Sequence, residues 1–315
     1  MDLMSLLSRA ADATKPGTRD ILPVGSLVLL VIALVAGGAP GKAPSFRRFV
    51  DWAGQLGAVG LALIVLAIIA ASIFLQPIVT AVSAVIEGRV AWMPLRLAMH
   101  PFVLLTMARR RRTQDRYDAL TKRLRDAAYL DPDQRAELSG LSDRLRRYPR
   151  EGRVRLTQLG NILAAGEEDA GQPYGLDARV VLPRLEILVR DEPSKQVAAR
   201  RDDLTFSTRF CATLLLSVVV STALLAPHLL SWAVVVPGVA LVLAVLAYRN
   251  AIAAAVAYAE ALRMLFDLER KFLYVAMGVP LPARSRDEYE TGRAITLALS
   301  SRIPIDLALH NESAE

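Results

Sequence analysis

The chain has one cysteine and three histidines among 315 residues. Because a disulfide needs two cysteines and a zinc site needs several thiolate or imidazole ligands, the single Cys211 excludes a disulfide framework and a cysteine zinc site. The histidines are His100, His228 and His310, in three different regions. We therefore expect neither a histidine metal site nor a catalytic histidine with partners. Cys211 is expected to serve as a small apolar residue of a helix.

Nucleotide-binding signatures are also missing. No GxGxxG sequence follows a strand pattern and opens a helix, and the stretch GAPGKAPS lacks the spacing of a phosphate-binding loop. The sequence pI is about 9.8, but much of the basic surplus flanks apolar runs, and the middle of the chain interleaves acids with bases. This pattern favours membrane topology and attraction to anionic lipid at the inner surface over nucleic-acid binding. We expect no cofactor and no nucleic-acid partner.

Charged residues are absent from three long apolar runs, at 21–37, 56–86 and 210–248. A bilayer core about 30 Å thick takes roughly 20 helical residues to cross, and Pro227 interrupts the third run near its middle. The pattern predicts an all-α integral membrane protein with four transmembrane helices in two hairpins, at residues 21–37, 56–85, 210–226 and 230–248. A cleaved signal peptide is disfavoured for the first run, because a long polar leader precedes it.

Basic residues beside the spans predict which side of the membrane each loop faces. Four arginines follow the second span at 109–112, three precede the third span at 200–209, and the loop between the third and fourth spans has no lysine or arginine. We therefore expect a bacterial plasma-membrane location with both termini and the middle segment in the cytoplasm. Three basic residues at 42–48 lie on the opposite side and weaken the rule for the first hairpin.

A long uninterrupted helix predicts a cytoplasmic stalk. No proline or glycine occurs from residue 239 to residue 277, and at about 1.5 Å per residue such a helix is about 60 Å long, twice the hydrocarbon thickness. Its inner half is expected to pair with a helix capped by Ser194 and to carry a helical domain. The resulting division is a cytoplasmic leader at 1–20, a first transmembrane hairpin at 21–88, an interfacial basic and aromatic segment at 89–112, a helical cytoplasmic domain at 113–193 packed on the stalk, a second transmembrane hairpin with stalk extensions at 194–278, and a cytoplasmic tail at 279–315 with one helix at 286–301.

Apolar periodicity predicts how these soluble helices pack. The domain at 113–193 is expected to begin with a helical hairpin, whose second helix starts at the cap Asp131 with Pro132 in its first turn and carries a basic outer face. Trp92 and neighbouring arginines suit a segment that lies on the inner membrane surface. In the stalk the predicted apolar face is Leu262, Leu265, Phe266, Leu273 and Val275.

The segment LGNILAAGEEDAGQPYGLDARVVLPRL, residues 159–185, is rich in glycine, proline and acidic residues. Its pattern predicts a helix that ends at Gly166, a tight loop set by Gly171, Pro173 and Gly175, and a second helix capped by Asp177. The segment is therefore expected to form a helix, a stiff corner and another helix.

Polar residues of this corner are the candidate functional residues. We expect Gly160 to lie where a side chain does not fit, and Tyr174 to bury its ring while its hydroxyl forms a hydrogen bond. Arg184 is expected to form an ion pair with Glu167 or Asp177, and Pro183 to end or kink a helical turn. The predicted partner-binding or hinge residues are Asn161, Glu167, Tyr174, Gly175, Asp177, Pro183 and Arg184.

This combination of residues resembles a motif of uncharacterised multi-pass membrane proteins of actinobacteria and other bacteria. The residues that carry the resemblance are Leu159-Gly160-Asn161, Glu167-Glu168, Tyr174-Gly175-Leu176-Asp177 and Pro183-Arg184-Leu185. Members often have a tryptophan before Pro-Arg-Leu and a proline before Leu-Gly-Asn, and this chain departs from that at Leu182 and Thr157. The resemblance implies a membrane protein with a specific cytoplasmic corner and implies no activity.

Within the predicted spans the polar residues are uncharged. Coupled transport normally leaves an ionisable residue inside a span, and none occurs here. Ser72, Gln76 and Thr80, with Pro77, lie in the second span and are the candidates for a pore lining or for hydrogen bonding between helices.

Three functions are consistent with this pattern. The first is a non-enzymatic membrane protein whose cytoplasmic helical domain binds or senses a protein partner, as an anchor, scaffold or signal coupler. The alternative is an oligomeric channel or membrane-perturbing effector gated by that domain, which requires a homo-oligomer. A third is an enzyme acting on lipid or envelope precursors through the acidic corner. The expected partners are the bilayer, anionic lipid, an unknown cytoplasmic protein and further copies of the chain.

Overall fold

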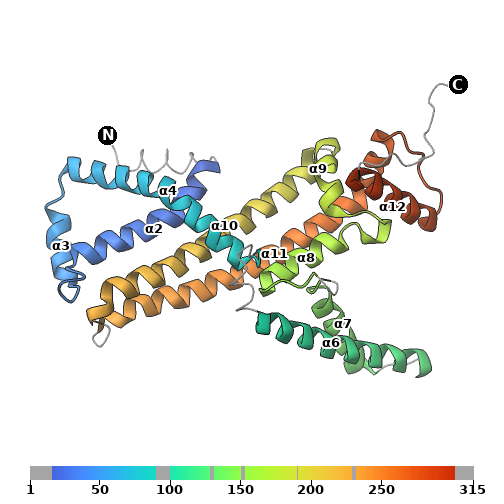
Figure 1. Cartoon of the computed structure of the whole chain (residues 1–315), viewed down its shortest axis with the longest axis horizontal. Helices are drawn as coiled ribbons and strands as arrows, with labels where there is room; N and C mark the ends of the chain where they lie inside the picture. The colour runs from blue at the N-terminus through green and yellow to red at the C-terminus, as the bar shows by residue number, and fades with distance from the viewer. Residues whose placement is uncertain are drawn as a thin grey trace. The chain divides into compact units, whose positions relative to one another are not determined.

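The computed structural model describes residues 16–89, 100–127, 131–149, 153–189, 191–228 and 232–301. Every secondary-structure element in these ranges is helical (Figure 1), so the all-α prediction is confirmed for them. Residues 1–15 of the expected leader, the interfacial residues around Trp92 and the chain end beyond Pro304 lie outside the described residues.

The chain divides into two compact units. Unit 1 is Met1–Ile86 with Thr205–Ala251, and unit 2 is Glu87–Leu204 with Ile252–Glu315. In chain order the helices are α2 (Pro16–Ala36), α3 (Phe46–Gly54), α4 (Ala58–Ile86), α6 (His100–Ala127), α7 (Pro132–Leu145), α8 (Gln158–Asp169), η1 (Gln172–Tyr174), α9 (Ala178–Leu188), α10 (Asp191–Leu225), η2 (Ala226–His228), η3 (Trp232–Val234), α11 (Val235–Ala276) and α12 (Ser285–Ser301). Helices α10 and α11 contribute residues to both units.

Three helical segments of the described residues are long and apolar enough to cross a membrane: Ala58–Ile86, Glu192–His228 and Val235–Ala276. They correspond to the second, third and fourth predicted spans. The apolar part of α2, Leu22–Ala36, is shorter. Large apolar side chains such as Phe74 are exposed along α4, which is stable where lipid rather than water covers the helix. These three helices are therefore the evidence that the chain is a membrane protein.

In unit 1, α2 packs against α4. Val24 and Leu27 of α2 are buried, and a Cβ on Gly25 would lie 3.3 Å from Cγ2 of Ile68 in α4. A small residue at this position therefore permits the two helices to approach closely.

Polar groups of α10 and α11 within unit 1 are satisfied locally. Ser217 and Ser221 donate to backbone carbonyls four residues earlier, and Asn250 donates to the Ser207 hydroxyl at 3.0 Å. Cys211 is buried, with its sulfur 3.6 Å from the carbonyl oxygen of Ala244. Buried polar groups need such partners where water is excluded.

In unit 2, the apolar core lies between α9, the later part of α11 and α12. Val181 and Leu185 of α9, Leu262 and Phe266 of α11 and Ile295 of α12 are fully buried. Each such side chain stabilises the fold by roughly 1.5–3 kcal/mol relative to exposure. Unit 2 therefore has a core of its own.

The predicted apolar face of α11 is confirmed in part. Leu262, Leu265, Phe266 and Leu273 are buried, whereas Val275 is 62% exposed. Val275 lies nine residues after Phe266, which at 100° per residue is half a turn out of phase. The prediction was wrong for Val275 because an apolar residue was assigned to the core without regard to its angle on the helix.

Helices α6 and α7 form the predicted helical hairpin. They pack against each other, Leu120 and Leu141 are buried, and Arg116 forms an ion pair with Glu137. Helix α7 begins after Asp131 as predicted, although the Asp131 side chain makes no capping hydrogen bond. Helix α6 runs through residue 112 without a break, so the four arginines at 109–112 belong to this helix.

The remaining boundaries agree closely with the sequence pattern. Helix α12 begins one residue before the predicted position and ends where predicted. Helix α10 begins at Asp191, so Ser194 lies inside its first turn and the prediction that Ser194 caps this helix was wrong. Helix α11 has 42 residues and is therefore about 60 Å long, as predicted.

Two leucines of α11 provide a matched test of the unit 2 core. Leu265 is 2% exposed and Leu268 is 65% exposed. We expect Leu265→Ala to destabilise the protein by about 2–5 kcal/mol, because it leaves a cavity, and Leu268→Ala to change stability by less than about 0.5 kcal/mol. The measurement is thermal unfolding of the full chain in detergent, followed by circular dichroism. Equal effects of the two substitutions would contradict this description of the core.

Candidate functional site

The corner consists of α8, η1 and α9. Thr157 caps α8, and its hydroxyl accepts a hydrogen bond from the Gly160 amide at 3.0 Å. The helix continues past Gly166 to Asp169, so the prediction that it ends at Gly166 was wrong. A Cβ on Gly166 would lie 2.5 Å from the Cβ of Ala259 in α11. This glycine therefore permits α8 to lie against α11 rather than ending the helix.

Asn161 holds the start of α8. Its side chain is buried, its Oδ1 accepts from the Arg155 amide at 2.7 Å, and its Nδ2 donates to the Arg155 carbonyl at 3.1 Å. These two hydrogen bonds fix the backbone of Arg155 against the first turn of α8. A Cβ on Gly160 would overlap the carbonyl oxygen of Glu87, which confirms that no side chain fits at Gly160.

The turn between α8 and α9 is set by two glycines. A Cβ on Gly171 would overlap the carbonyl oxygen of Leu176, and Gly175 has a φ of +70°, in the left-handed region. Side chains are strained at positive φ by about 1–2 kcal/mol. The predicted stiff loop is confirmed at both glycines.

Helix α12 crosses this turn with backbone against backbone. A Cβ on Gly175 would overlap the carbonyl oxygen of Tyr289, and a Cβ on Gly292 would overlap the carbonyl oxygen of Tyr174. Thr296 of α12 donates to the carbonyl of Gly175 at 3.3 Å and accepts from the amide of Asp177 at 3.1 Å. Glycine is therefore required on both sides of the crossing.

Tyr174 connects the turn to α11 and α12. Its hydroxyl donates to Asp267 at 2.8 Å, and the guanidinium of Arg270 lies 3.8 Å from the centre of its ring. Arg270 also donates to Glu288 of α12 at 2.7 Å. Burial, and then the hydrogen bond to Asp267, raise the pKa of Tyr174, so the neutral phenol is the form that the fold stabilises. The hydroxyl of Tyr174 forms a hydrogen bond as predicted, whereas its ring is only half-buried against the core of unit 2.

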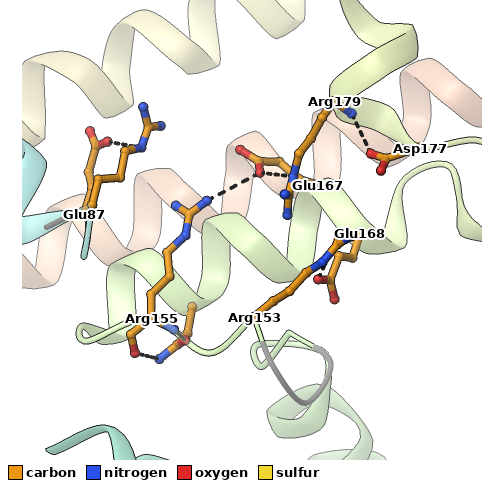
Figure 2. A network of polar contacts seen from close by, with 9 residues as sticks. Glu87, Arg153, Arg155, Glu167, Glu168, Asp177 and Arg179 are labelled. Atoms are coloured by element: carbon orange, nitrogen blue, oxygen red, sulfur yellow. Dashed lines mark hydrogen bonds and ion pairs between the residues drawn. The ribbon is translucent and has the colours of Figure 1, made fainter. Parts of the chain in front are cut away.

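Glu167 lies at the centre of a polar network on α8 (Figure 2). Its Oε2 is 3.1 Å from Nε of Arg179 and 3.6 Å from Nη2 of Arg155. Next to it, Glu168 pairs with Arg153 at 3.4 Å. Burial lowers the pKa of Arg155, and the charge of Glu167 opposes that effect. The network ties α8 to α9 and to the segment before α8.

The expected ion pair of Arg184 does not form. Its Nη1 donates instead to the carbonyl of Val180 in its own helix at 2.6 Å, and Arg179 takes the place beside Glu167. Asp177 acts as the predicted cap, since its side chain accepts from the Arg179 amide at 3.0 Å. Pro183 lies inside α9, which continues to Leu188, so the helix does not end there.

The acidic residues of the corner serve as structural partners. Glu167 and Glu168 pair with arginines, Asp177 caps α9, and Asp169 lies 3.0 Å from Arg263. A cavity of about 290 Å³ borders the network and is lined in part by Glu168 and Thr296. No group of three or more histidine, cysteine or acidic residues suited to a metal ion occurs within the described ranges. The corner thus has the arrangement of a rigid connection.

Sequence reasoning missed the residues that complete the corner. Arg155, Arg179, Asp267, Arg270 and Gly292 all contact it, and three of them lie about a hundred residues away along the chain. Arg179 had a detectable signal, because it follows the cap Asp177 in the first turn of α9. The other residues carry no local pattern that distinguishes them from ordinary surface residues.

The later part of α11 has an exposed apolar stripe. Its members are Met264, Leu268, Phe272 and Val275, all exposed, at steps of four, four and three residues. Such steps place side chains on one face of a helix. We refer to these four residues as the α11 stripe, and it lies on a different face from Leu262 and Phe266 in the core.

The polar residues predicted for the second span do not share one environment. Ser72 is buried and its hydroxyl donates to the carbonyl of Ile68 at 2.7 Å. Gln76, Pro77 and Thr80 are exposed on α4. Ser72 therefore forms its hydrogen bond within its own helix, whereas Gln76 and Thr80 form an exposed polar pair.

The glycine of the turn gives a test of the α12 crossing. We expect Gly175→Ala to speed hydrogen exchange of the α12 amides in the full chain at least tenfold, because the methyl group is strained at positive φ and overlaps Tyr289. The matched control is Gly140→Ala in α7, where an added Cβ meets nothing within 4 Å and alanine favours the helix by up to about 1 kcal/mol. Unchanged α12 exchange in Gly175→Ala would contradict the crossing.

Comparison with family models, with curated proteins and with solved structures gives no match to this chain. The resemblance to multi-pass membrane proteins of actinobacteria stays a prediction. Function is therefore inferred from the residues that unit 1 and unit 2 each bring together.

Proposed function

We propose that this chain is a non-enzymatic multi-pass membrane protein whose unit 2 binds a protein partner, as an anchor, scaffold or signal coupler. The observation that carries the proposal is the α11 stripe. Its four side chains lie on one exposed face of a helix whose other face is the core of unit 2.

The size and border of the stripe support a helical partner. Met264 and Val275 are 11 residues apart, about 16 Å along the helix, which is three turns of a partner helix. Charged residues border the stripe at Glu260, Asp267 and Lys271, all exposed. An apolar centre with a polar rim is typical of protein interfaces. We infer that the partner presents an apolar helix face with polar flanks.

Lipid is a poor alternative cover for the stripe. Six charged residues occur between 260 and 271: Glu260, Arg263, Asp267, Glu269, Arg270 and Lys271. Each aspartate, lysine or arginine costs roughly 2.5–3.5 kcal/mol at the centre of a membrane helix. This part of α11 is therefore expected to lie outside the hydrocarbon, where exposed apolar side chains need a protein partner.

The corner supports a binding role rather than catalysis. Tyr174, Gly175 and Asp177 hold α12 and α9 on α11, and Glu167 is neutralised by Arg155 and Arg179. Such contacts make the base of the stripe rigid, and rigid surfaces lose less entropy on binding. The corner residues thus have a structural role as the rigid support, and the recognition surface is the α11 stripe.

The proposal includes a four-span topology in a bacterial plasma membrane, with two hairpins and both termini in the cytoplasm. The apolar part of α2 is Leu22–Ala36, and α2 packs on α4, which supports its role as a fourth span. Unit 2 then occupies the cytoplasm.

The α11 stripe is tested by charge insertion. We expect Leu268→Arg and Val275→Arg to reduce recovery of one discrete crosslinked partner more than tenfold, because each buries an unpaired charge in an apolar contact. The measurement is crosslinking in native membranes followed by purification of the tagged full chain and identification of the partner.

The matched control is Ile187→Arg, which inserts the same charge at an exposed isoleucine of α9, 84% exposed and outside the stripe. Recovery of the partner and the protein level are expected to stay at the wild-type values in this control. The same set of crosslinked proteins in all four chains would disprove the role of the stripe.

An oligomeric channel is the second candidate, supported by the exposed pair Gln76 and Thr80. A polar amide on an apolar membrane helix is most stable when it forms a hydrogen bond with another helix. A second copy of α4 offers the same amide, and Pro77 beside it leaves one carbonyl without its helical donor. This favours contact between copies at the position of Gln76.

We expect Gln76→Leu to lower the association constant of the chain in liposomes about 3–30-fold, since hydrogen bonds between membrane helices contribute roughly 0.6–2 kcal/mol. Single-molecule photobleaching of the labelled chain measures the fraction of oligomers. Ser72→Ala is the control, because the Ser72 hydroxyl is bonded within its own helix. A strictly monomeric wild-type chain would eliminate the channel.

A further inference from the structure

Unit 2 contains a basic cavity that the proposed function does not use. It has a volume of about 490 Å³ and lies between α6, α7 and the start of α8. Its lining includes Arg109, Arg112, Arg144, Arg147, Tyr148 and Gln158. Sites for small ligands have volumes of roughly 300–1,000 Å³, so the cavity accommodates more than a single inorganic ion.

The charge of the cavity is of one sign. Among the residues that the structure describes, four arginines contribute to the lining and no aspartate or glutamate does. Arg109 and Arg112 are three residues apart on one face of α6, and Arg144 in the last turn of α7 is followed by Arg147 in the turn after that helix. Like charges at this spacing destabilise a helix. An anion between the two pairs removes that repulsion.

The other arginines near the corner differ in this respect. Arg116, Arg153, Arg179, Arg263 and Arg270 each pair with a carboxylate. Among the residues that the structure describes, no carboxylate pairs with an arginine of the cavity. The fold therefore places four guanidinium groups around one space without supplying the anion.

Uncharged donors and a helix end complete the lining. Tyr148 presents a hydroxyl group, and Gln158 is the first residue of α8. The N-terminal end of a helix carries a partial positive charge and binds anions. Asn161 also lines the cavity, and its hydrogen bonds to the Arg155 backbone hold this helix end in place. The site thus combines the backbone amides of a helix end with side-chain donors.

We propose that this cavity binds a phosphate-bearing anion with at least two negative charges. Guanidinium groups bind phosphate oxygens in bidentate geometry, and one pair on α6 with a second pair at the end of α7 suits two phosphate groups or one doubly charged ester. A single carboxylate leaves most of the four charges unmatched. The same chemistry occurs in a phospholipid headgroup and in a soluble phosphate ester, and the experiment distinguishes these two sources.

The test uses the full chain in phosphatidylcholine nanodiscs at about 0.15 M salt, where charges more than about 8 Å apart in solvent are largely screened. Inorganic pyrophosphate is the soluble probe, with its dissociation constant measured by calorimetry. Nanodiscs that also contain cardiolipin are the lipid probe, with retained cardiolipin counted by native mass spectrometry. We expect the double substitution Arg112→Glu with Arg147→Glu to weaken at least one of the two at least tenfold.

The matched control is Arg123→Glu with Arg125→Glu, which changes the net charge equally on exposed positions of α6 outside the cavity. We expect a change of less than about twofold in this control. The single substitution Arg112→Lys keeps the charge but loses the bidentate geometry, and an intermediate loss is expected without unfolding.

Loss of pyrophosphate binding in the cavity variant alone supports a soluble phosphate ester as the source. Loss of cardiolipin alone supports a lipid headgroup. Equal losses in the cavity and control variants, or no binding of either probe by the wild-type chain, would overturn the proposal.

Discussion

The backbone contact between α12 and the corner is the constraint on which unit 2 depends. Gly175 and Gly292 lie where any side chain would overlap a carbonyl oxygen of the facing segment, so the two segments meet at the shortest separation that a polypeptide allows. This approach brings Thr296 within reach of the turn and Glu288 within reach of Arg270. These polar contacts with α12 follow from that crossing and, being partly exposed, add modestly to stability.

Unit 2 has two kinds of charged surface, which differ in whether acidic residues neutralise the arginines. Around the corner Glu167, Glu168 and Asp169 each pair with an arginine, and Glu167 pairs with two of them, so the fold itself neutralises these charges. Between α6, α7 and α8 four arginines share a cavity, and the described part of its lining contains no acidic residue. The first arrangement holds helices together, and the second leaves charge available for a ligand.

Helix α11 connects these features with the apolar interior of unit 2. One of its faces carries Leu262 and Phe266 into the core, while the α11 stripe lies half a turn away and remains exposed. A helix with two apolar faces has more apolar surface than its own unit covers. The rigid attachment of α11 to the corner through Tyr174 and Asp267 makes the stripe a fixed surface for a partner.

The sequence by itself determined what depends on neighbouring residues: the all-α class, the apolar segments, the start of α7 after Asp131, the extent of α12 and the glycines that the turn requires. These follow from local periodicity, caps and steric limits. Only the tertiary structure decided that Arg179 rather than Arg184 pairs with Glu167, that Gly166 lies against Ala259 instead of ending α8, and that four arginines share a cavity. Each of these depends on which helix faces meet, and residues separated by up to a hundred positions carry no local signal of their contact.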